Sequence, residues 1–388
     1  MNMNTTFTLA TSFNSAHMEA ARATAGRLRH WLLHGPAQLR GGEQVGGVAG
    51  LIDAADKPRY VYAEITGYYL SWLADVANDT DASMLRERAQ QNLNLLARER
   101  AQAAVDWASR AFAHAGQAPQ TRIYLDAAEA DWRNDAVFFF DLAMLLRGID
   151  AADESGIAAP SQALRATLQE QLSHFARDGS LRAAIQLCGT HSLPTRWSTL
   201  GGPFLVKASS RVAYGERHRA LPPALALACE NDSARWAPRA GTIDLGMLHP
   251  TLYFAEGLLL SRPDRADGIA QLLQRCLALT HADGSLPEDS VMNKADGSTR
   301  VRNDILAQAL RVGLLLREAK TPGAPTQAAL DGLAATLLER IGDGEFLTFN
   351  ADTAGQANVW ATMFAEQALR WYALDDSASR RPAADALV

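Results

Sequence analysis

A glutamate lies inside an aromatic, otherwise apolar segment near the N-terminal end of the chain. The segment reads YVYAEITGYYLSWLA over 60–74, and Glu64 has tyrosines on both sides of it. Burial among aromatic rings disfavours the charged carboxylate and raises its pKa, so Glu64 could hold a proton for a leaving group. A carboxylate in the first turn of a helix also stabilises the helix dipole, and this structural role is the alternative interpretation of Glu64.

Further acids occur in the stretch YLDAAEADWRNDAVFFFDLAM over 124–144. Four of them lie just before or at the start of the next apolar helix, namely Asp126, Glu129, Asp131 and Asp135. Cleavage of a glycosidic bond uses two carboxyl groups in different environments, one protonated and one charged. We therefore expect one of these acids to lie close to Glu64, on a neighbouring helix. In the alternative interpretation, Asp131 or Asn134 caps the helix and the other acids are solvated.

A histidine, a tyrosine and a glutamate share one face of the stretch HPTLYFAEGLLL. His249, Tyr253 and Glu256 are spaced by four and three residues, which brings them together on a helix. Such groups facing a sugar can abstract a proton beside a carbonyl or carboxylate. A histidine that begins a helix can instead be a cap or a core residue, so both interpretations of His249 stay open.

Two further charged features are candidates for binding substrate. Lys207 stands inside the apolar run FLVKASSRVA, where an unpaired charge is costly, so we expect it to meet a carboxylate or an acidic substrate. The segment HADGSLPEDSVMNKADGSTRVRND over 281–304 is rich in charged residues of both signs. We predict that this loop grips substrate, with Asp289 and Arg302 as its candidates.

The elements that must position these residues are helices. Apolar periodicity predicts about twelve of them, near 17–34, 62–78, 82–114, 133–151, 160–178, 203–218, 222–230, 248–261, 263–280, 302–318, 324–342 and 357–373. Long connections alternate with short ones, and the long ones lie near 35–61, 115–132, 179–202, 231–247, 281–301 and 343–356. If consecutive helices are antiparallel, every long loop emerges at the same end of the molecule. Long loops in a compact domain are usually functional, so we predict the site at that end.

The helices that follow long loops are apolar almost all round, which is typical of buried helices. Each also carries a polar residue inside its apolar run; these are Glu64, Asp141, Lys207, Glu256, Gln308 and Gln367. We therefore predict an all-α fold, an (α/α)6 toroid of about twelve antiparallel helices whose even-numbered members form the inner wall. We expect one domain over 1–373 and a disordered tail over 374–388. The alternative is an open α-solenoid that binds a protein or peptide along a groove.

Aromatic residues mark the predicted functional end. Four tryptophans stand at or near the junctions between long loops and inner helices, namely Trp132, Trp197, Trp236 and Trp360. Their flat apolar faces suit stacking against sugars, and six helix N-termini with free N–H groups favour anionic or hydroxyl-rich ligands. The tryptophans could instead simply plug the loop–helix joints, since Trp is large and mostly buried.

Two of these segments resemble family 8 glycoside hydrolases. EITGY at 64–68, followed by an apolar helix, resembles the Glu-x-x-Gly-Tyr element of that family, whose glutamate is the general acid. The Asn-Asp-Ala step at 134–136 resembles its Ser-Asp-Ala-Asp stretch, where an aspartate contacts the distorted sugar or the attacking water, although Val137 replaces the second aspartate. The resemblance implies that Glu64 is the acid and Asp135 the sugar or water contact. More broadly, the chain resembles the six-hairpin glycosidase superfamily, which includes unsaturated uronyl hydrolases, sugar 2-epimerases, and uronate epimerases and lyases.

These observations give a ranked set of functions. The candidate catalytic residues are Glu64, Asp135, Asp289 and His249, and the candidate substrate-binding residues are Tyr68, Trp132, Trp197, Lys207, Tyr253, Glu256, Arg302 and Trp360. The first hypothesis is a glycoside hydrolase that acts on a bacterial polysaccharide or oligosaccharide by carboxylate acid/base chemistry. The alternatives are a sugar or uronate epimerase, a polysaccharide lyase, or a non-catalytic toroid that binds glycan or protein in polysaccharide biosynthesis.

Composition and motifs exclude several kinds of binding partner. A net charge of −6 and a pI near 5.9 give no basic footprint, so we expect no nucleic-acid partner. No P-loop, Rossmann fingerprint or HExxH occurs, so we expect no cofactor. LCGTH offers Cys188 and His191, similar to zinc-dependent lanthionine cyclases, but their Cys-His partner motif is absent and no metal is expected. Three scattered cysteines, no export segment and no long apolar stretch predict a cytoplasmic protein without a membrane span.

Overall fold

The computed structural model describes residues 3–78, 84–112, 119–187, 192–214, 221–291, 300–350, 353, 355–374 and 381–388. Its α-helices are α1 (Met3–His34), α2 (Ala63–Ala77), α3 (Met84–Phe112), α4 (Phe139–Glu154), α5 (Gln162–Ser173), α6 (Leu205–Tyr214), α7 (Pro223–Trp236), α8 (Leu248–Ser261), α9 (Ala266–Leu277), α10 (Asn303–Glu318), α11 (Gln327–Ile341) and α12 (Val359–Tyr372). Each corresponds to one predicted helical stretch. In this part of the chain, no helix has both the length and the apolar character needed to cross a bilayer.

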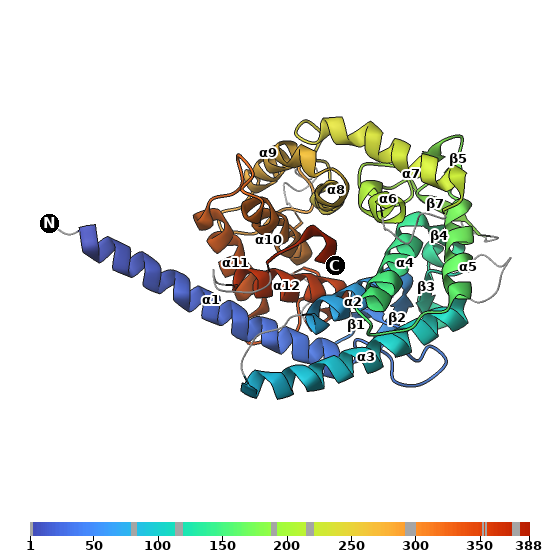
Figure 1. Cartoon of the computed structure of the whole chain (residues 1–388), viewed down its shortest axis with the longest axis horizontal. Coiled ribbons are helices and arrows are strands. Elements are labelled where there is room, and N and C mark those ends of the chain that lie inside the picture. The colour runs from blue at the N-terminus through green and yellow to red at the C-terminus, as the bar shows by residue number, and fades with distance from the viewer. Residues whose placement is uncertain are drawn as a thin grey trace.

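The helices form a closed ring of two layers (Figure 1). Each even-numbered helix contacts the next even-numbered one, from α2 through α4, α6, α8 and α10 to α12, and α12 contacts α2 again. Each odd-numbered helix from α3 to α11 packs outside the even-numbered helix that precedes it, and α1 closes the outer layer against α12. The predicted (α/α)6 toroid, with the even-numbered helices inside, is confirmed, and the open solenoid is wrong because α12 meets α2.

The inner helices approach one another closely where glycine replaces a side chain. A Cβ atom on Gly67 in α2 would overlap the carbonyl of Met144, and one on Gly148 in α4 would overlap the carbonyl of Gly67. The two glycines therefore allow the backbones of α2 and α4 to touch. This crossing fixes the start of α2 relative to the start of α4.

The long loops contain short strands that the helical pattern did not predict. Strands β1 (Ala49–Ile52), β2 (Pro58–Tyr62), β3 (Arg122–Tyr124) and β8 (Ala357–Asn358) form one antiparallel sheet in the order β3-β2-β1-β8. In its register Tyr62 lies opposite Arg122 and Tyr60 opposite Tyr124. The alternating tyrosines of this segment are suited to a pleated surface, and the sheet holds them beside the start of α2.

The fourth helix begins later than predicted. Residues Trp132–Asp135 form a short 3-10 helix, and the Asp131 side chain caps it by accepting a hydrogen bond from the Arg133 N–H, as the capping interpretation predicted. Strand β4 (Ala136–Phe138) then pairs with β7 (Ala184–Gln186), and α4 starts only at Phe139. The aromatic and β-branched run VFFF explains this, because such residues favour strand pairing. Two more short strands, β5 (Ala176–Arg177) and β6 (Ser180–Leu181), form a hairpin.

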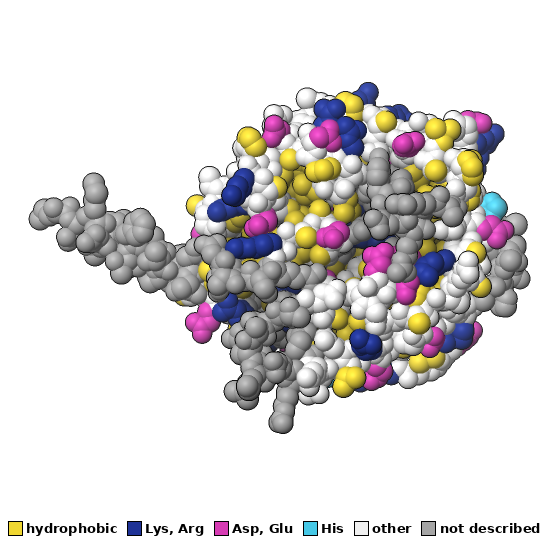
Figure 2. Space-filling view, in the orientation of Figure 1, with side chains coloured by type: hydrophobic (Ala, Val, Ile, Leu, Met, Phe, Trp, Pro, Cys, Tyr) yellow, Lys and Arg dark blue, Asp and Glu magenta, His cyan; other side chains and the backbone are white. Residues whose placement is uncertain are grey.

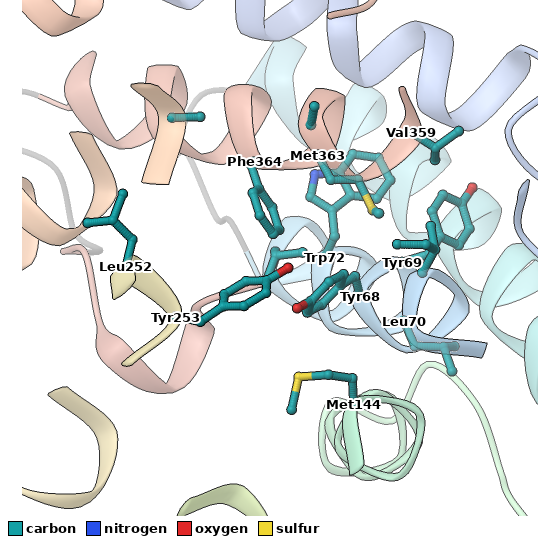
Figure 3. Close-up of a cluster of buried hydrophobic side chains, with 14 of the residues drawn as sticks. Tyr68, Tyr69, Leu70, Trp72, Met144, Leu252, Tyr253, Val359, Met363 and Phe364 are labelled. Atoms are coloured by element: carbon teal, nitrogen blue, oxygen red, sulfur yellow. The ribbon is translucent and has the colours of Figure 1, made fainter. Parts of the chain in front are cut away.

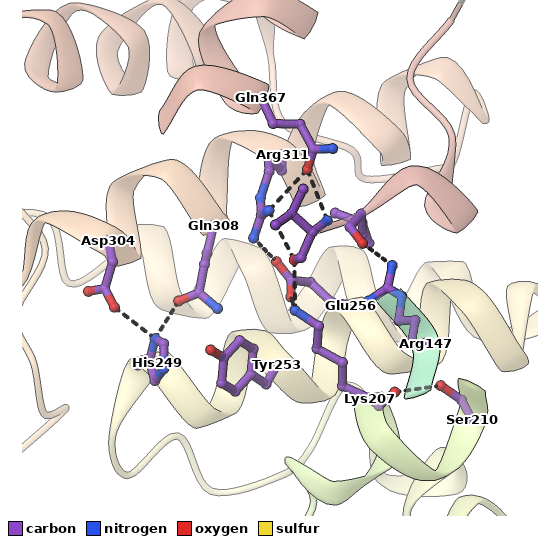
Figure 4. Close-up of polar contacts among 12 residues, drawn as sticks. Arg147, Lys207, Ser210, His249, Tyr253, Glu256, Asp304, Gln308, Arg311 and Gln367 are labelled. Carbon is purple, nitrogen blue, oxygen red and sulfur yellow. Dashed lines mark hydrogen bonds and ion pairs between the residues drawn. The ribbon is translucent and has the colours of Figure 1, made fainter. Parts of the chain in front are cut away.

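The end of the chain turns into the ring, and the predicted disorder is wrong for residues 381–388. Leu387 and Val388 are fully buried. The Val388 carbonyl oxygen accepts hydrogen bonds from Lys207 Nζ at 2.9 Å and from Arg311 Nη1 at 3.2 Å, and Arg147 donates to the Leu387 carbonyl (Figure 4). Cationic side chains inside the ring thus provide partners that the polar composition of the tail does not suggest. Residues 375–380 lie outside the described residues.

The centre of the ring is packed with aromatic and aliphatic side chains. Tyr68, Tyr253 and Phe364 meet there from three inner helices (Figure 3), with ring centroids 5.4 Å apart for Tyr68–Phe364 and 6.5 Å for Tyr253–Phe364. On the face seen in Figure 2, acidic and basic side chains are interspersed over the outer surface. These side chains fill the centre of the ring, so a cavity at one end of the ring is closed at its base.

Candidate active site

A cavity of about 350 Å³ opens where the inner helices begin, at the end that carries the long loops. Its wall includes Tyr62, Glu64, Arg122, Arg133, Phe140, Asp141, Arg196, Trp197, Phe204, His249, Tyr253, Arg302 and Trp360. The volume lies in the ordinary range of small-molecule sites. Strands β2 and β3 and the starts of α2, α4, α8 and α12 contribute side chains, so the cavity depends on the ring and the loop sheet together.

Two carboxyl groups face this cavity from the first turns of adjacent helices. Burial raises the pKa of Glu64 in α2, and burial followed by repulsion from Glu64 raises the pKa of Asp141 in α4 well above its usual value. The Tyr62 hydroxyl donates to Asp141 Oδ1 at 3.1 Å, and the Tyr253 hydroxyl lies 3.4 Å from Glu64 Oε1. Two mutually repelling carboxyls do not both ionise readily, so one of them tends to hold a proton.

A histidine and its orienting aspartate form the second chemical feature of the cavity. His249 Nδ1 lies 3.1 Å from Asp304 Oδ2 and 2.8 Å from Gln308 Oε1 (Figure 4). Since both partners offer oxygen acceptors, we assign the hydrogen to Nδ1, which leaves Nε2 with a lone pair. Burial, and then the charge of Arg302, lowers the pKa of His249, so the imidazole is neutral at pH 7 and can accept a proton.

The charge on Asp304 is fixed by its neighbours. Burial alone would raise its pKa, but Arg302 and His249 outweigh that effect and hold the pKa well below the usual range. Arg302 donates to both carboxylate oxygens, at 3.1 and 2.6 Å, and Trp360 Nε1 lies 3.3 Å from Oδ2. Asp304 is therefore an ionised carboxylate that positions His249 in one orientation.

A buried ion-pair network lies beneath the cavity. Lys207 Nζ is 2.7 Å from one oxygen of Glu256, and Arg311 Nη2 is 2.6 Å from the other, with all three side chains inaccessible to solvent. The Lys207 ammonium also lies over the rings of Tyr68 and Tyr253, at 4.7 and 4.5 Å from their centroids. Lys207 and Glu256 were predicted to bind substrate, but they bind each other instead. Of the two partners expected for Lys207, a carboxylate or an acidic substrate, the structure shows the carboxylate.

The structure brings six of the predicted site residues to the cavity wall. They are Glu64, Trp197, His249, Tyr253, Arg302 and Trp360. Tyr68 and Trp132 lie just behind the wall, Tyr68 buried among the central aromatics and Trp132 packed edge-on against Phe138. Trp236, at the fourth junction, stacks with Arg235 and Arg239 away from the cavity.

The two aspartates predicted to be catalytic, Asp135 and Asp289, are not on the cavity wall. Asp135 ends the 3-10 helix before β4, so the delayed start of α4 places Asp141, not Asp135, in the helix's first turn. Asp289 is exposed, and its carboxylate accepts a hydrogen bond from the Val291 N–H at 3.0 Å, which makes it a turn-forming residue. The acidic character of Asp135 and Asp289 alone therefore did not predict where they lie relative to the cavity.

Sequence reasoning missed several residues of the wall. Asp141 was recognised only as a polar residue of an inner helix. Asp304, which lies behind the wall and contacts His249, was noted only as part of the charged segment 281–304. Arg122, Arg133 and Arg196 were not selected at all, because they come from two long connections, one before α4 and one before α6, whose strands and turns were not predicted. The alternation YVYAE before α2 is the one pattern that could have indicated the sheet.

No cluster of three His, Cys, Asp or Glu side chains suited to a metal ion occurs in the part of the chain that the structure describes. Cys188 and His191, which the sequence offered as a pair, lie outside the described residues.

Several solved structures share the toroidal fold of this chain. A D-mannose isomerase superposes with a TM-score of 0.57 at 13% identity, over 93% of this chain and 97% of that one. A cellobiose 2-epimerase from Spirochaeta thermophila gives 0.57 at 14%, over 91% and 97%. An unsaturated glucuronyl hydrolase specific for heparin gives 0.57 at 11%, over 92% and 96%. The chain has the six-hairpin glycosidase fold.

At these identities the likeness concerns the fold. No protein-family model matches the sequence, and a comparison with curated proteins finds no relative. The six-hairpin glycosidase fold explains why the inner helix starts and the long loops converge on one cavity, but the reaction must be argued from the residues in that cavity.

Proposed function

We propose that the protein is a carbohydrate-active enzyme, and that its reaction is hydrolysis of a glycosidic bond. The observation that carries the proposal is the buried carboxyl pair of Glu64 and Asp141 on the cavity wall, with aromatic side chains around it. Glycoside hydrolysis needs one protonated and one charged carboxyl. The similar structures, titled as enzymes of sugars and glucuronyl groups, support the carbohydrate class.

The two carboxyls have different environments, and these suggest their roles. Asp141 has the more strongly raised pKa, so it is the proposed general acid, which gives its proton to the glycosidic oxygen as the bond to the anomeric carbon breaks. Burial raises the pKa of Glu64 too, but Tyr62 and Lys207 moderate the effect, so Glu64 is the proposed base that takes a proton from the attacking water. This reverses the assignment of the acid to Glu64 that the family resemblance implied.

Trp197 and Trp360 are proposed to hold the sugar by stacking, as the sequence suggested. Their indole rings lie on the wall of the cavity, and Trp197 packs edge-on against Phe204 with centroids 5.0 Å apart. A bacterial polysaccharide or oligosaccharide as substrate and a cytoplasmic location also belong to this proposal, and they rest on the sequence alone.

The second candidate is a sugar isomerase or epimerase. The neutral imidazole of His249, oriented by Asp304, favours it, because such a base can remove a proton from carbon beside a carbonyl. Tyr253, whose ring centroid is 4.3 Å from that of His249, could then polarise the carbonyl. The two candidates share the cavity but differ in which residue is indispensable.

Isosteric variants of the two carboxyl residues test the proposed hydrolysis. Glu64→Gln and Asp141→Asn each keep nearly the same volume, so both should fold and bind sugars but lose hydrolysis by about a hundredfold or more. Asp141→Asn should regain rate on aryl glycosides, whose leaving group needs no acid, whereas Glu64→Gln should not. Asp264→Asn, an exposed carboxylate at the far end of α8, is the control and should behave as wild type.

The activity of His249→Ala distinguishes glycoside hydrolysis from sugar isomerisation or epimerisation. If this variant alone is inactive, and the wild type exchanges a sugar proton with deuterated solvent, the isomerase or epimerase is correct. If the wild type turns over no sugar in a broad panel yet binds several, the protein is a glycan-binding toroid and both enzymatic proposals fail.

A further inference from the structure

Three arginines form one wall of the cavity, and the structure holds each against an aromatic ring. The guanidinium of Arg122 in β3 lies 4.3 Å from the ring centroid of Tyr60 and 4.5 Å from that of Tyr62. Arg133 and Arg196 lie over the indole of Trp132, at 4.6 and 5.7 Å. All three side chains line the cavity that also contains the carboxyl pair. We call these residues the arginine wall.

The arginine wall has more positive charge than its neighbours neutralise. Arg133 is paired with Asp131, but among the described residues no carboxylate lies within ion-pair distance of Arg122 or Arg196. Burial, and then repulsion from Arg133, lowers the pKa of Arg196; Arg122 adds to this shift, while Glu288 and Asp131 oppose it without cancelling it. Like charges gathered in a partly buried site are unfavourable unless an anion joins them.

The position of Arg122 connects the arginine wall to the chemistry. Its charge lowers the pKa of both Glu64 and Asp141, so it stands within electrostatic reach of the carboxyl pair. Its Nε atom is buried without a hydrogen-bond partner among the described residues. An anion held by Arg122 and Arg196 would therefore lie beside the reacting bond and supply the missing acceptor.

We propose that the arginine wall is a binding site for an anionic group of the substrate, so that the enzyme acts on an acidic saccharide. A carboxylate, sulfate or phosphate on the sugar can each accept paired hydrogen bonds from planar guanidinium groups. The proposal rests on the proposed function for its substrate, but it is tested by binding, without turnover.

The test compares two sugars that differ in one group. Methyl β-D-glucuronide and methyl β-D-glucoside have a carboxylate and a hydroxymethyl group, respectively, at the same carbon, and calorimetry would give both dissociation constants. The glucuronide, or the glucose 6-sulfate or glucose 6-phosphate used as parallel probes, should bind about tenfold more tightly than the glucoside. The preference should weaken as salt is raised. Which anionic probe binds best identifies the group.

Variants show whether the arginine wall causes the preference. Arg196→Ala should weaken binding of the anionic probe by about tenfold and binding of the glucoside far less, so that the preference is lost, while Arg196→Lys should retain part of it. Arg239→Ala is the matched control, because Arg239 lies 5.6 Å from the Trp236 ring in a similar stack but is exposed and outside the cavity. Melting temperatures would establish that all variants fold.

The proposal is overturned if neutral and anionic probes bind equally, or if Arg196→Ala weakens both alike. These outcomes are independent of the proposed hydrolysis. Hydrolysis that depends on Glu64 and Asp141 but ignores substrate charge would overturn only the anion site. A charge preference that Arg196→Ala removes, in a protein that hydrolyses nothing, would overturn only the proposed reaction.

Discussion

At the scale of single residues, the informative ones were polar side chains inside apolar stretches. Glu64 and Asp141 were singled out on that ground, and both lie on the cavity wall. Lys207 satisfied the same criterion, yet it forms a buried ion pair with Glu256. An apolar context predicts that a polar residue has a specific partner, but it does not tell whether that partner is a ligand or another side chain.

The pH dependence of the proposed hydrolysis should depend on Arg122. Activity should rise as Glu64 loses its proton and fall as Asp141 loses its own, and both pKa values are raised by burial. Arg122 lowers both values, so Arg122→Gln should raise them and move the whole kcat/KM profile to higher pH. Arg239→Gln, away from the cavity, should leave the profile in place. A profile unmoved by Arg122→Gln would contradict the assigned pair.

Lys207 should give the protein an unusual stability profile in alkaline solution. Burial lowers its pKa to about 7 although Glu256 opposes the shift, so between that value and its ordinary pKa the unfolded chain binds the extra proton. The contribution of Lys207 to the free energy of unfolding therefore increases as pH rises from about 7 towards about 10.4. Urea unfolding should show that Lys207→Met lacks this contribution. An identical pH slope in wild type and variant would refute the assignment.

At the scale of elements, the helices were predictable and the loops were not. All twelve predicted helical stretches have a counterpart, because 3.6-residue periodicity is a local property of the sequence. The sheet of β1, β2, β3 and β8 joins segments from distant parts of the chain, and its pairing is decided by tertiary contacts. Since these strands position Tyr62 and Arg122, one side of the candidate site was beyond prediction from local pattern.

The contact between α2 and α4 offers a direct test of the inner wall. Gly67→Ala would press a methyl group into the carbonyl of Met144, so it should lower the free energy of unfolding by about 1–3 kcal/mol. Gly332→Ala, on the open face of α11 with no neighbour within 4 Å, should instead raise it by about 0.5–1 kcal/mol. Denaturant melts of both variants would measure the contrast. Equal effects would mean that the two inner helices do not touch there.

At the scale of the whole molecule, stability should depend on ring closure. The contact of α12 with α2 joins the last helix to the first inner one, and α1 packs against α12. A fragment that ends after residue 280 lacks α10, α11 and α12, so it should show no cooperative unfolding transition by circular dichroism. A soluble fragment with a sharp transition would show that the first nine helices fold as an independent unit.

The packed base of the cavity also decides how molecules move through it. Tyr68, Tyr253, Phe364 and the Lys207–Glu256 pair fill the ring below the carboxyls, so the described residues close the cavity at its base. Whatever enters must leave by the same opening. A long polysaccharide could offer only its terminus to such a blind pocket, and each product would have to vacate it before the next chain end arrives. If the protein hydrolyses glycans as proposed, this geometry favours trimming from an end over cutting in the middle, and the departing sugar competes directly with the incoming one.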